Sequence, residues 1–209
     1  MAIPATRINV RRISTQDAWE AAYVLSASHA DYPAFDFAFP HARQRERVVR
    51  GLMTATARDV ERRGYGYLVR VGGIAAGAAL WFPPGTPARG GWDSVQVAAS
   101  MLPVALAGRG RFPAFARAGA ALEEAARDED GWYLQALGVT PQQQGRGLGA
   151  RLLVPVLEAA DSHAVTCGLH TSDSANVAFY ERFGFEQIEP LHPIVPDGPA
   201  YLRMCRQPQ

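Results

Sequence analysis

The stretch Gly-Val-Thr-Pro-Gln-Gln-Gln-Gly-Arg-Gly-Leu-Gly, residues 138–149, decides the fold of this chain and marks a site. It joins an apolar segment typical of a strand, residues 132–139, to a segment with helical spacing, residues 150–161. Glycines lack the Cβ atoms that keep an anion away from the backbone, and the first turn of a helix offers unpaired N–H groups. The sequence therefore predicts a site for a phosphate group at the start of this helix.

Two common nucleotide-binding loops fit this stretch poorly. A P-loop requires Gly-Lys-Ser/Thr, and the chain contains no lysine. The run Gly145-x-Gly147-x-x-Ala150 does match the dinucleotide pattern. That pattern also requires an acidic residue about 20 positions on, at the end of the next strand. Here the expected strand, residues 164–169, is followed by His170-Thr171, which argues against a dinucleotide site.

A second informative segment follows at residues 171–185. It is typical of a helix that is capped at its start by Asp173 or Ser174. Gly184 suits the left-handed position after the end of that helix. Asn176 and Tyr180 lie four residues apart, so we expect them to share one helical face.

Together the two segments resemble the GNAT family of N-acetyltransferases. The coenzyme A loop of that family, Gln/Arg-x-x-Gly-x-Gly/Ala, is matched by Gln144-Gly-Arg-Gly147-Leu-Gly149. Its second signature is matched by Asn176, Phe179-Tyr180 and Gly184-Phe185. The resemblance implies an α/β fold with a mixed, mostly antiparallel, twisted sheet of about seven strands flanked by helices. A narrower likeness, to the puromycin N-acetyltransferase branch, rests on residues 30–34, 132–141, 153–160 and 195–199.

The resemblance implies direct transfer of an acetyl group from acetyl-CoA to the primary amine of a small molecule, without a metal. It also implies which residues hold the coenzyme. Loop amides would bind the pyrophosphate, and the end of the preceding strand would pair with the pantetheine arm and supply an oxyanion donor. The candidate coenzyme-binding residues are Leu137, Gly138, Val139, Gln144, Gly145, Arg146, Gly147, Leu148, Gly149, Ala150 and Asn176.

Two side chains are candidates for proton transfer. Tyr180 occupies the position at which the family protonates the leaving thiolate, and a phenol with a pKa near 10 is protonated at pH 7. The alternative is a core tyrosine, although Phe179 and Phe183 already form an apolar stripe. His170 stands where puromycin-type sequences have glutamate, so it is a candidate base for the incoming ammonium. A structural histidine is the alternative.

The acceptor side is expected near residues 29–39, which we interpret as an aromatic-rich loop. Tyr32 and Phe35 are the candidate substrate-binding residues, either as a ligand wall or by packing against an insertion. That insertion, residues 83–130, mixes glycine and proline turns with alanine-rich helical pieces. Helical spacing predicts a helix over residues 43–63 with a solvated arginine face, and Gly72-Gly73 predicts a hairpin between residues 65–71 and 74–82.

The bulk properties limit the partners. The chain has 209 residues, of which 48% are hydrophobic, and a formal net charge of +1. This suits one domain over residues 1–209 and gives no basic field for nucleic acid or a membrane surface. Without an apolar run of about 18 residues, we expect a cytoplasmic protein, either a monomer or a homodimer. Two other functions stay open, namely a non-catalytic acetyl-CoA-binding regulatory module and a protein or peptide N-acetyltransferase.

Overall fold

A computed structural model describes residues 7–86, 91–127, 131–190 and 201–209. Within them one seven-stranded sheet has the order β1-β2-β3-β4-β5-β7-β6. Neighbouring strands are antiparallel, except for β4 and β5, which are parallel. The predicted mixed, mostly antiparallel sheet is thus confirmed. The strands are β1 (Ile8–Arg12), β2 (Tyr65–Val71), β3 (Ile74–Phe82), β4 (Trp132–Val139), β5 (Cys167–Thr171), β6 (Glu186–Pro190) and β7 (Leu202–Arg206).

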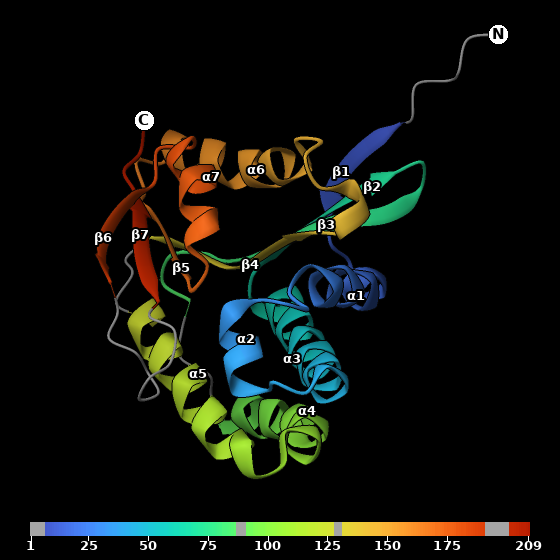
Figure 1. Ribbon diagram of the computed structural model, residues 1–209. Coiled ribbons are helices and arrows are strands. Elements are labelled where there is room, and N and C mark those ends of the chain that lie inside the picture. Colours follow the sequence, from blue (N-terminus) through green and yellow to red (C-terminus); the bar gives the residue numbers. More distant parts are fainter. Residues whose placement is uncertain (1–6, 87–90, 128–130, 191–200) are drawn as a thin grey trace, which may run out of the picture.

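Helices lie on both faces of this sheet (Figure 1). On one face, α6 and α7 pack against the central strands; α1 and α3 pack on the other, and α4 lies outside α3. Helices α4 and α5 form the predicted helical insertion. The helices are α1 (Ala18–Ser28), α2 (Pro33–Ala38), α3 (Ala42–Arg63), α4 (Gly91–Gly108), α5 (Phe112–Arg127), α6 (Leu148–Ser162) and α7 (Val177–Glu181).

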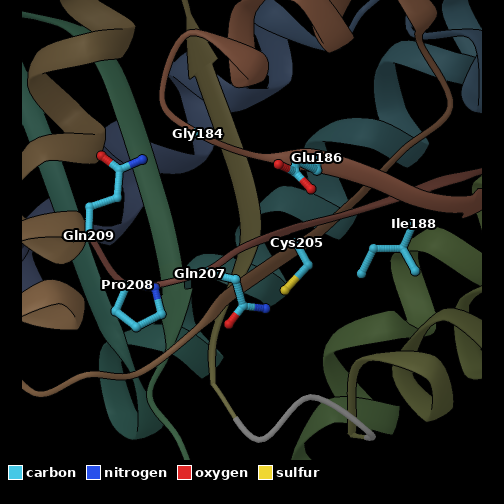
Figure 2. A pocket seen from close by; sticks show the side chains of 7 residues that line it. All are labelled: Gly184, Glu186, Ile188, Cys205, Gln207, Pro208 and Gln209. Carbon is cyan, nitrogen blue, oxygen red and sulfur yellow. The ribbon is translucent and has the colours of Figure 1, made fainter.

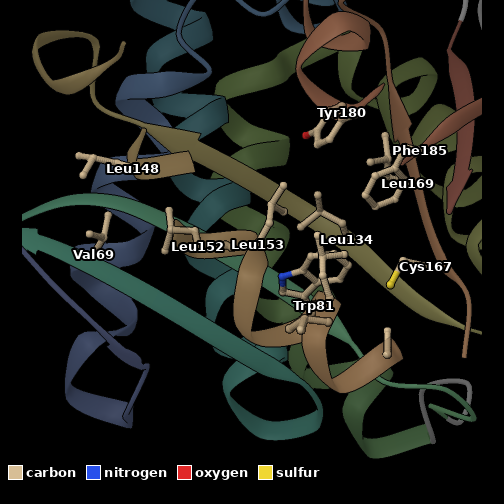
Figure 3. Packing of buried hydrophobic residues seen from close by; sticks show 14 of the residues in the cluster. Val69, Trp81, Leu134, Leu148, Leu152, Leu153, Cys167, Leu169, Tyr180 and Phe185 are labelled. Carbon is tan, nitrogen blue, oxygen red and sulfur yellow. The ribbon is translucent and has the colours of Figure 1, made fainter. Parts of the chain in front are cut away.

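The two faces bury separate hydrophobic clusters, because successive strand residues point to opposite sides. Leu68 belongs to the cluster under α1 and α3, and its neighbour Val69 belongs to the cluster under α6. Figure 3 shows the α6 cluster, in which leucines of that helix pack on Trp81 of β3. Both clusters meet at the central strands, so the sheet centre is a rigid support for the loop that follows β4.

The segment from His29 to Phe39 is not the loop that we expected. It contains the short helix α2, with Tyr32 at its N-cap and Pro33 in its first turn. Proline suits that position because its missing N–H has no helical partner there. Arg45 holds the segment, since it donates to the carbonyls of Ala30 and Phe39 at 2.7 and 3.0 Å.

Arg45 also corrects our expectation of a solvated arginine face on the helix over residues 43–63. It is only 8% exposed and forms ion pairs with Asp31 and Asp36. The helix itself and the hairpin between β2 and β3 are confirmed.

The segment after β5 is helical, but its α-helix is shorter than expected. A 3-10 turn, Ser174–Asn176, comes first, and α7 covers five residues. Asp173 is the cap, because its side chain accepts the N–H of Ala175 at 3.0 Å. Gly184 has the expected left-handed conformation, with φ of 81°.

Candidate active site

The two parallel strands at the sheet centre separate and leave an opening. β4 and β5 pair at only three positions, the last being Leu134 with Leu169. β4 continues to Val139, whereas β5 ends at Thr171. In the described parts of the chain, no strand pairs with the β5-facing edge of residues 136–139. An extended ligand arm can pair with such an edge, as the family resemblance implies for the pantetheine arm.

A β-bulge in β4 lies directly before this open edge. One extra residue, Gln135, stands between the pairs Leu80–Ala136 and Trp81–Leu134. Gln135 is exposed, although both of its neighbours are buried. A bulge of this kind bends a strand and changes where its side chains point. The bulge therefore sets the direction of the candidate coenzyme-binding residues that follow it.

After the bulge, the side chains of β4 divide between the two faces. Leu137 and Val139 pack against the cluster under α6. Gly138 faces α1, where a Cβ atom would come within 1.9 Å of the Ser28 Oγ. Gly138 thus permits a close approach of α1 to β4, and its contribution to a ligand would be made by its backbone.

The loop after β4 carries an open cradle of backbone. Gly145 and Gly147 have left-handed φ angles of 73° and 71°, a region that side chains with a Cβ rarely adopt. Among the described residues, and apart from the two chain neighbours of each glycine, no atom lies within 4 Å of a Cβ built at either position. Gly147 is the N-cap of α6, so its conformation turns the chain into the helix.

The first turn of α6 has donors without a capping side chain. Gly147 makes no side-chain cap bond, so the amides of Leu148, Gly149 and Ala150 face the loop without such a partner. Gln144 donates to the Val139 carbonyl at 3.1 Å, and Arg146 to Gln143. The positive helix end and these amides suit a pyrophosphate.

Tyr180 lies where α7 meets the sheet and is only 8% exposed. It is the buried residue of α7 and a member of the cluster under α6, and the partly buried Phe179 and Phe183 pack against the same cluster. Figure 3 shows its hydroxyl pointing away from Phe185 and Leu169. Burial and, to a smaller extent, the Tyr32 phenol raise the pKa of Tyr180, so the hydroxyl is protonated at pH 7.

His170 lies on β5, and its side chain contacts that of Tyr133, a residue that was given no role from the sequence. The Tyr133 hydroxyl is 2.9 Å from His170 Nδ1. Among the described residues, the buried Nε2 atom has no hydrogen-bond partner. Burial and then the Arg203 charge lower the pKa of His170 to about 4, so the imidazole is neutral at pH 7.

Tyr32 reaches the end of β5 with its hydroxyl. That hydroxyl accepts the N–H of Ser172 at 2.6 Å and lies 3.1 Å from Thr171 Oγ1. Asn176 donates to the same Thr171 oxygen at 3.4 Å. The structure thus brings the candidate acceptor-side tyrosine and the candidate coenzyme-side asparagine to one threonine.

Phe35 lies deeper than Tyr32. It is 7% exposed and packs between Tyr32 and Phe115 of the insertion, with ring centroids 5.8 and 6.0 Å away. This is the packing alternative that the sequence left open. A contact of Phe35 with a substrate stays a prediction.

Three further residues belong to this neighbourhood and were missed from the sequence: Tyr133, Thr171 and Tyr201. Burial raises the pKa of Tyr201, with a smaller effect of the Tyr32 phenol, so Tyr201 is a second protonated phenol near Tyr32. None of them was given a role from the sequence. They come together because β4, β5 and β7 are neighbours in the sheet.

A separate cavity of about 250 Å³ lies at the C-terminal end of the chain (Figure 2). None of the candidate site residues lines it; its lining comprises Gly184, Glu186, Ile188, Cys205, Gln207, Pro208 and Gln209. Within the described ranges, no three His, Cys, Asp or Glu side chains gather as metal ligands would. No helix in those ranges is long and apolar enough to cross a membrane.

Comparisons with known proteins agree with this geometry. Residues 111–205 match the family model of the acetyltransferase (GNAT) domain. An uncharacterized N-acetyltransferase of Schizosaccharomyces pombe is 29% identical over 126 residues, which are 57% of this chain and 51% of that protein. The chain therefore spans about half the length of this curated relative.

Solved structures share the fold over nearly the whole chain. A structure titled histone acetyltransferase HPA2 and related acetyltransferase, from Corynebacterium glutamicum, has a TM-score of 0.68 at 20% identity and covers 97% of each chain. A Drosophila melanogaster polyamine N-acetyltransferase has a TM-score of 0.59 at 17% identity, covering 96% of this chain and 100% of that one. The chain therefore has the fold of these acetyltransferase structures, and its residues 111–205 match the GNAT acetyltransferase domain.

Proposed function

We propose that the protein is an acetyl-CoA-dependent N-acetyltransferase that acts on the primary amine of a small molecule. The observation that carries this proposal is the open, left-handed glycine cradle at Gly145 and Gly147, beside a β4 edge that β5 leaves unpaired. The GNAT domain match over residues 111–205 supports it independently. Retention of a buried, protonated Tyr180 favours a working enzyme over a regulatory module that only binds the coenzyme.

The chain would hold the coenzyme by its backbone. The amides of residues 145–150 bind the pyrophosphate, and the free edge near Leu137 and Val139 pairs with the pantetheine arm. Asn176, which directly precedes α7, would contact the pantetheine arm. Acetyl-CoA, when bound, supplies a thioester carbonyl, and an N–H of the β4 edge stabilises the negative charge that develops on its oxygen.

Two protons must move during the transfer. The attacking nitrogen gives up a proton as its bond to the carbonyl carbon forms, and His170 Nε2 is the candidate acceptor. The sulfur takes up a proton as the carbon–sulfur bond breaks, and the Tyr180 hydroxyl is the candidate donor. Both groups are in the required state at pH 7, because burial keeps the imidazole neutral and the phenol protonated.

The acceptor would enter beside Tyr32, on the face covered by α2 and the insertion. The row of rings formed by Tyr32, Phe35 and Phe115 suits an amine with an apolar or aromatic body. Among the described residues, the charged group that shifts the pKa of His170 is Arg203 and not a carboxylate, so a second cation on the substrate gains nothing there. The likeness to puromycin-type sequences makes puromycin the first amine to try.

A protein or peptide acceptor is the second candidate. It is favoured by the likeness to a structure whose title includes a histone acetyltransferase. The likeness to a polyamine N-acetyltransferase favours a small amine instead. Both likenesses are below 25% identity, so our proposal rests on the row of aromatic rings at Tyr32, Phe35 and Phe115, which favours a small amine.

Competition among acceptors tests the proposal. Aryl-bearing amines, polyamines and histone-tail peptides are supplied at equal concentration with acetyl-CoA, and acetylated products are measured by mass spectrometry. We expect the aryl-bearing amines to be acetylated first. Preferred acetylation of the peptides would assign the protein to the second candidate function.

A further inference from the structure

The hydroxyl of Thr171 joins two segments that approach β5 from opposite faces of the sheet. Thr171 is the last residue of β5 and is 2% exposed. The Tyr32 hydroxyl lies 3.1 Å from its Oγ1 atom, and Asn176 Nδ2 donates to the same atom at 3.4 Å. Tyr32 directly precedes α2 and Asn176 directly precedes α7, and Figure 1 shows these helices on opposite sides of the sheet.

The contacts at both ends of this bridge are fixed by further bonds. Ser172 donates its N–H to the Tyr32 hydroxyl at 2.6 Å, so that oxygen is held by two consecutive residues of the chain. Asp173 donates its N–H to Thr171 Oγ1 at 3.2 Å, and its own side chain caps the turn before α7. The turn between β5 and α7 is therefore shaped around one buried hydroxyl group.

The position of the Tyr32 hydroxyl depends on α2. The backbone carbonyl of Tyr32 accepts the N–H groups of Phe35 and Asp36 at 2.9 and 3.0 Å. The Tyr32 ring packs against the rings of His29 and Phe35. A movement of α2 thus carries the hydroxyl with it. At the other end, Asn176 begins the helix that bears Tyr180 four residues later.

We propose that Thr171 is a positioning residue that couples the acceptor side to the coenzyme side, because it connects Tyr32 to Asn176 across the end of β5. The proposal rests on the proposed function, in which Asn176 contacts the coenzyme. Its consequence is that the hydroxyl of an acceptor-side tyrosine determines how tightly acetyl-CoA binds. The binding of an amine next to α2 would, by the same linkage, change the affinity for the coenzyme.

Coenzyme affinity measured by titration calorimetry tests the bridge. A neutral hydrogen bond typically changes an equilibrium about fivefold, so Tyr32→Phe and Thr171→Val should each weaken acetyl-CoA binding about fivefold. Because both substitutions break the same connection, the double variant should also be weakened about fivefold, rather than about 25-fold. Thr171→Ser, which keeps the hydroxyl, should bind as tightly as the unmodified protein.

Tyr23→Phe is the matched control, because Tyr23 lies on α1 with 61% exposure and its hydroxyl has no part in the bridge. It should leave the affinity unchanged. Unchanged affinity in Tyr32→Phe, or a double variant whose losses multiply, would overturn the proposal. The melting temperatures of all variants show whether a loss of affinity reflects unfolding. If Thr171→Val does not fold, the affinities of Thr171→Ser and Tyr32→Phe decide whether the bridge exists.

A second measurement does not depend on the coenzyme. In the free protein, the Asn176 side-chain amide signals in a ¹⁵N NMR spectrum should shift in Tyr32→Phe and stay in place in Tyr23→Phe. If the unmodified protein fails to bind acetyl-CoA, the proposed function is wrong, and the bridge is still tested by this spectrum. Asn176 signals that do not respond to Tyr32→Phe would refute the bridge alone.

Discussion

Tyr180 belongs to the hydrophobic cluster under α6, and its burial keeps the phenol protonated through the neutral range. We expect Tyr180→Phe to lower turnover about 100-fold while coenzyme affinity stays nearly constant, because only a proton donor is lost. Turnover under conditions that make the chemical step rate-limiting, together with calorimetry, measures both quantities.

Tyr201 provides the comparison for that experiment. It is also a phenol whose pKa is raised by burial, and it also lies near Tyr32. Tyr201→Phe should lower turnover far less than Tyr180→Phe. The reverse ranking would make Tyr201 the proton donor and contradict the role that we give to Tyr180.

The pH dependence of turnover tests His170. Burial and the Arg203 charge lower its pKa from 6.5 to about 4. Because His170 must be neutral to accept a proton, activity should rise through about pH 4 and show no limb near pH 6.5. His170→Asn should lower the rate throughout pH 5–8. A limb near pH 6.5 that survives in His170→Asn would exclude His170 as the base.

The residues at this site differ in how far the sequence predicted them. Gly147 and Tyr180 stand in motifs whose spacing carries the resemblance. Tyr133 was given no role from the sequence, because its contact with His170 arises only where β4 and β5 pair in parallel. Pairing of strands about 35 residues apart is a tertiary property that local periodicity does not encode.

At the scale of elements, α2 shows why the acceptor side was harder to predict. It has six residues, too few for helical spacing to stand out, and aromatic residues beside a proline resemble a loop. Long-range bonds from Arg45 hold the segment in place. Strands β2, β3 and β4 and helix α3, which are longer and regularly patterned, were predicted nearly to their bounds.

The role of Arg45 can be measured as the free energy of unfolding. Arg45→Leu should lower it by about 3 kcal/mol, because the part-buried carbonyl of Ala30 and the buried carbonyl of Phe39 lose their donor. Arg50→Leu is the matched control on the same helix, since Arg50 forms an exposed ion pair with Glu46. The control should change the value by less than about 0.5 kcal/mol. Equal losses in both variants would show that α2 does not depend on Arg45.

At the scale of the whole molecule, Asp161 ties α6 to the last strand. Its carboxylate pairs with Arg206 at 2.6 Å and accepts the N–H of Gln209 at 2.9 Å. The hydrogen bond from Arg206 and then that from Gln209 lower the pKa of Asp161 to about 2. A carboxyl with a lowered folded-state pKa stabilises the fold above its unfolded pKa, 3.8, and loses this contribution as the pH falls toward 2.

Urea unfolding between pH 2 and pH 7 checks this linkage. Asp161→Asn should be less stable than the unmodified protein at pH 7, and the difference should shrink as the pH falls from about 4 to about 2. Glu46→Gln, which removes only an exposed pair, should differ little at any pH. A deficit of Asp161→Asn that is constant over this range would contradict the expected coupling.

Acetyl-CoA binding to a matched pair of glycine variants tests the central claim most directly. Gly147 and Gly73 both have a left-handed φ and open space around a built Cβ, but Gly73 lies in the β2–β3 hairpin. Gly147→Val and Gly73→Val should therefore lower the melting temperature by similar amounts. Acetyl-CoA should raise the melting temperature of the unmodified protein and of Gly73→Val, but not that of Gly147→Val. Stabilisation of the unmodified protein by NADH and not by acetyl-CoA would contradict the account.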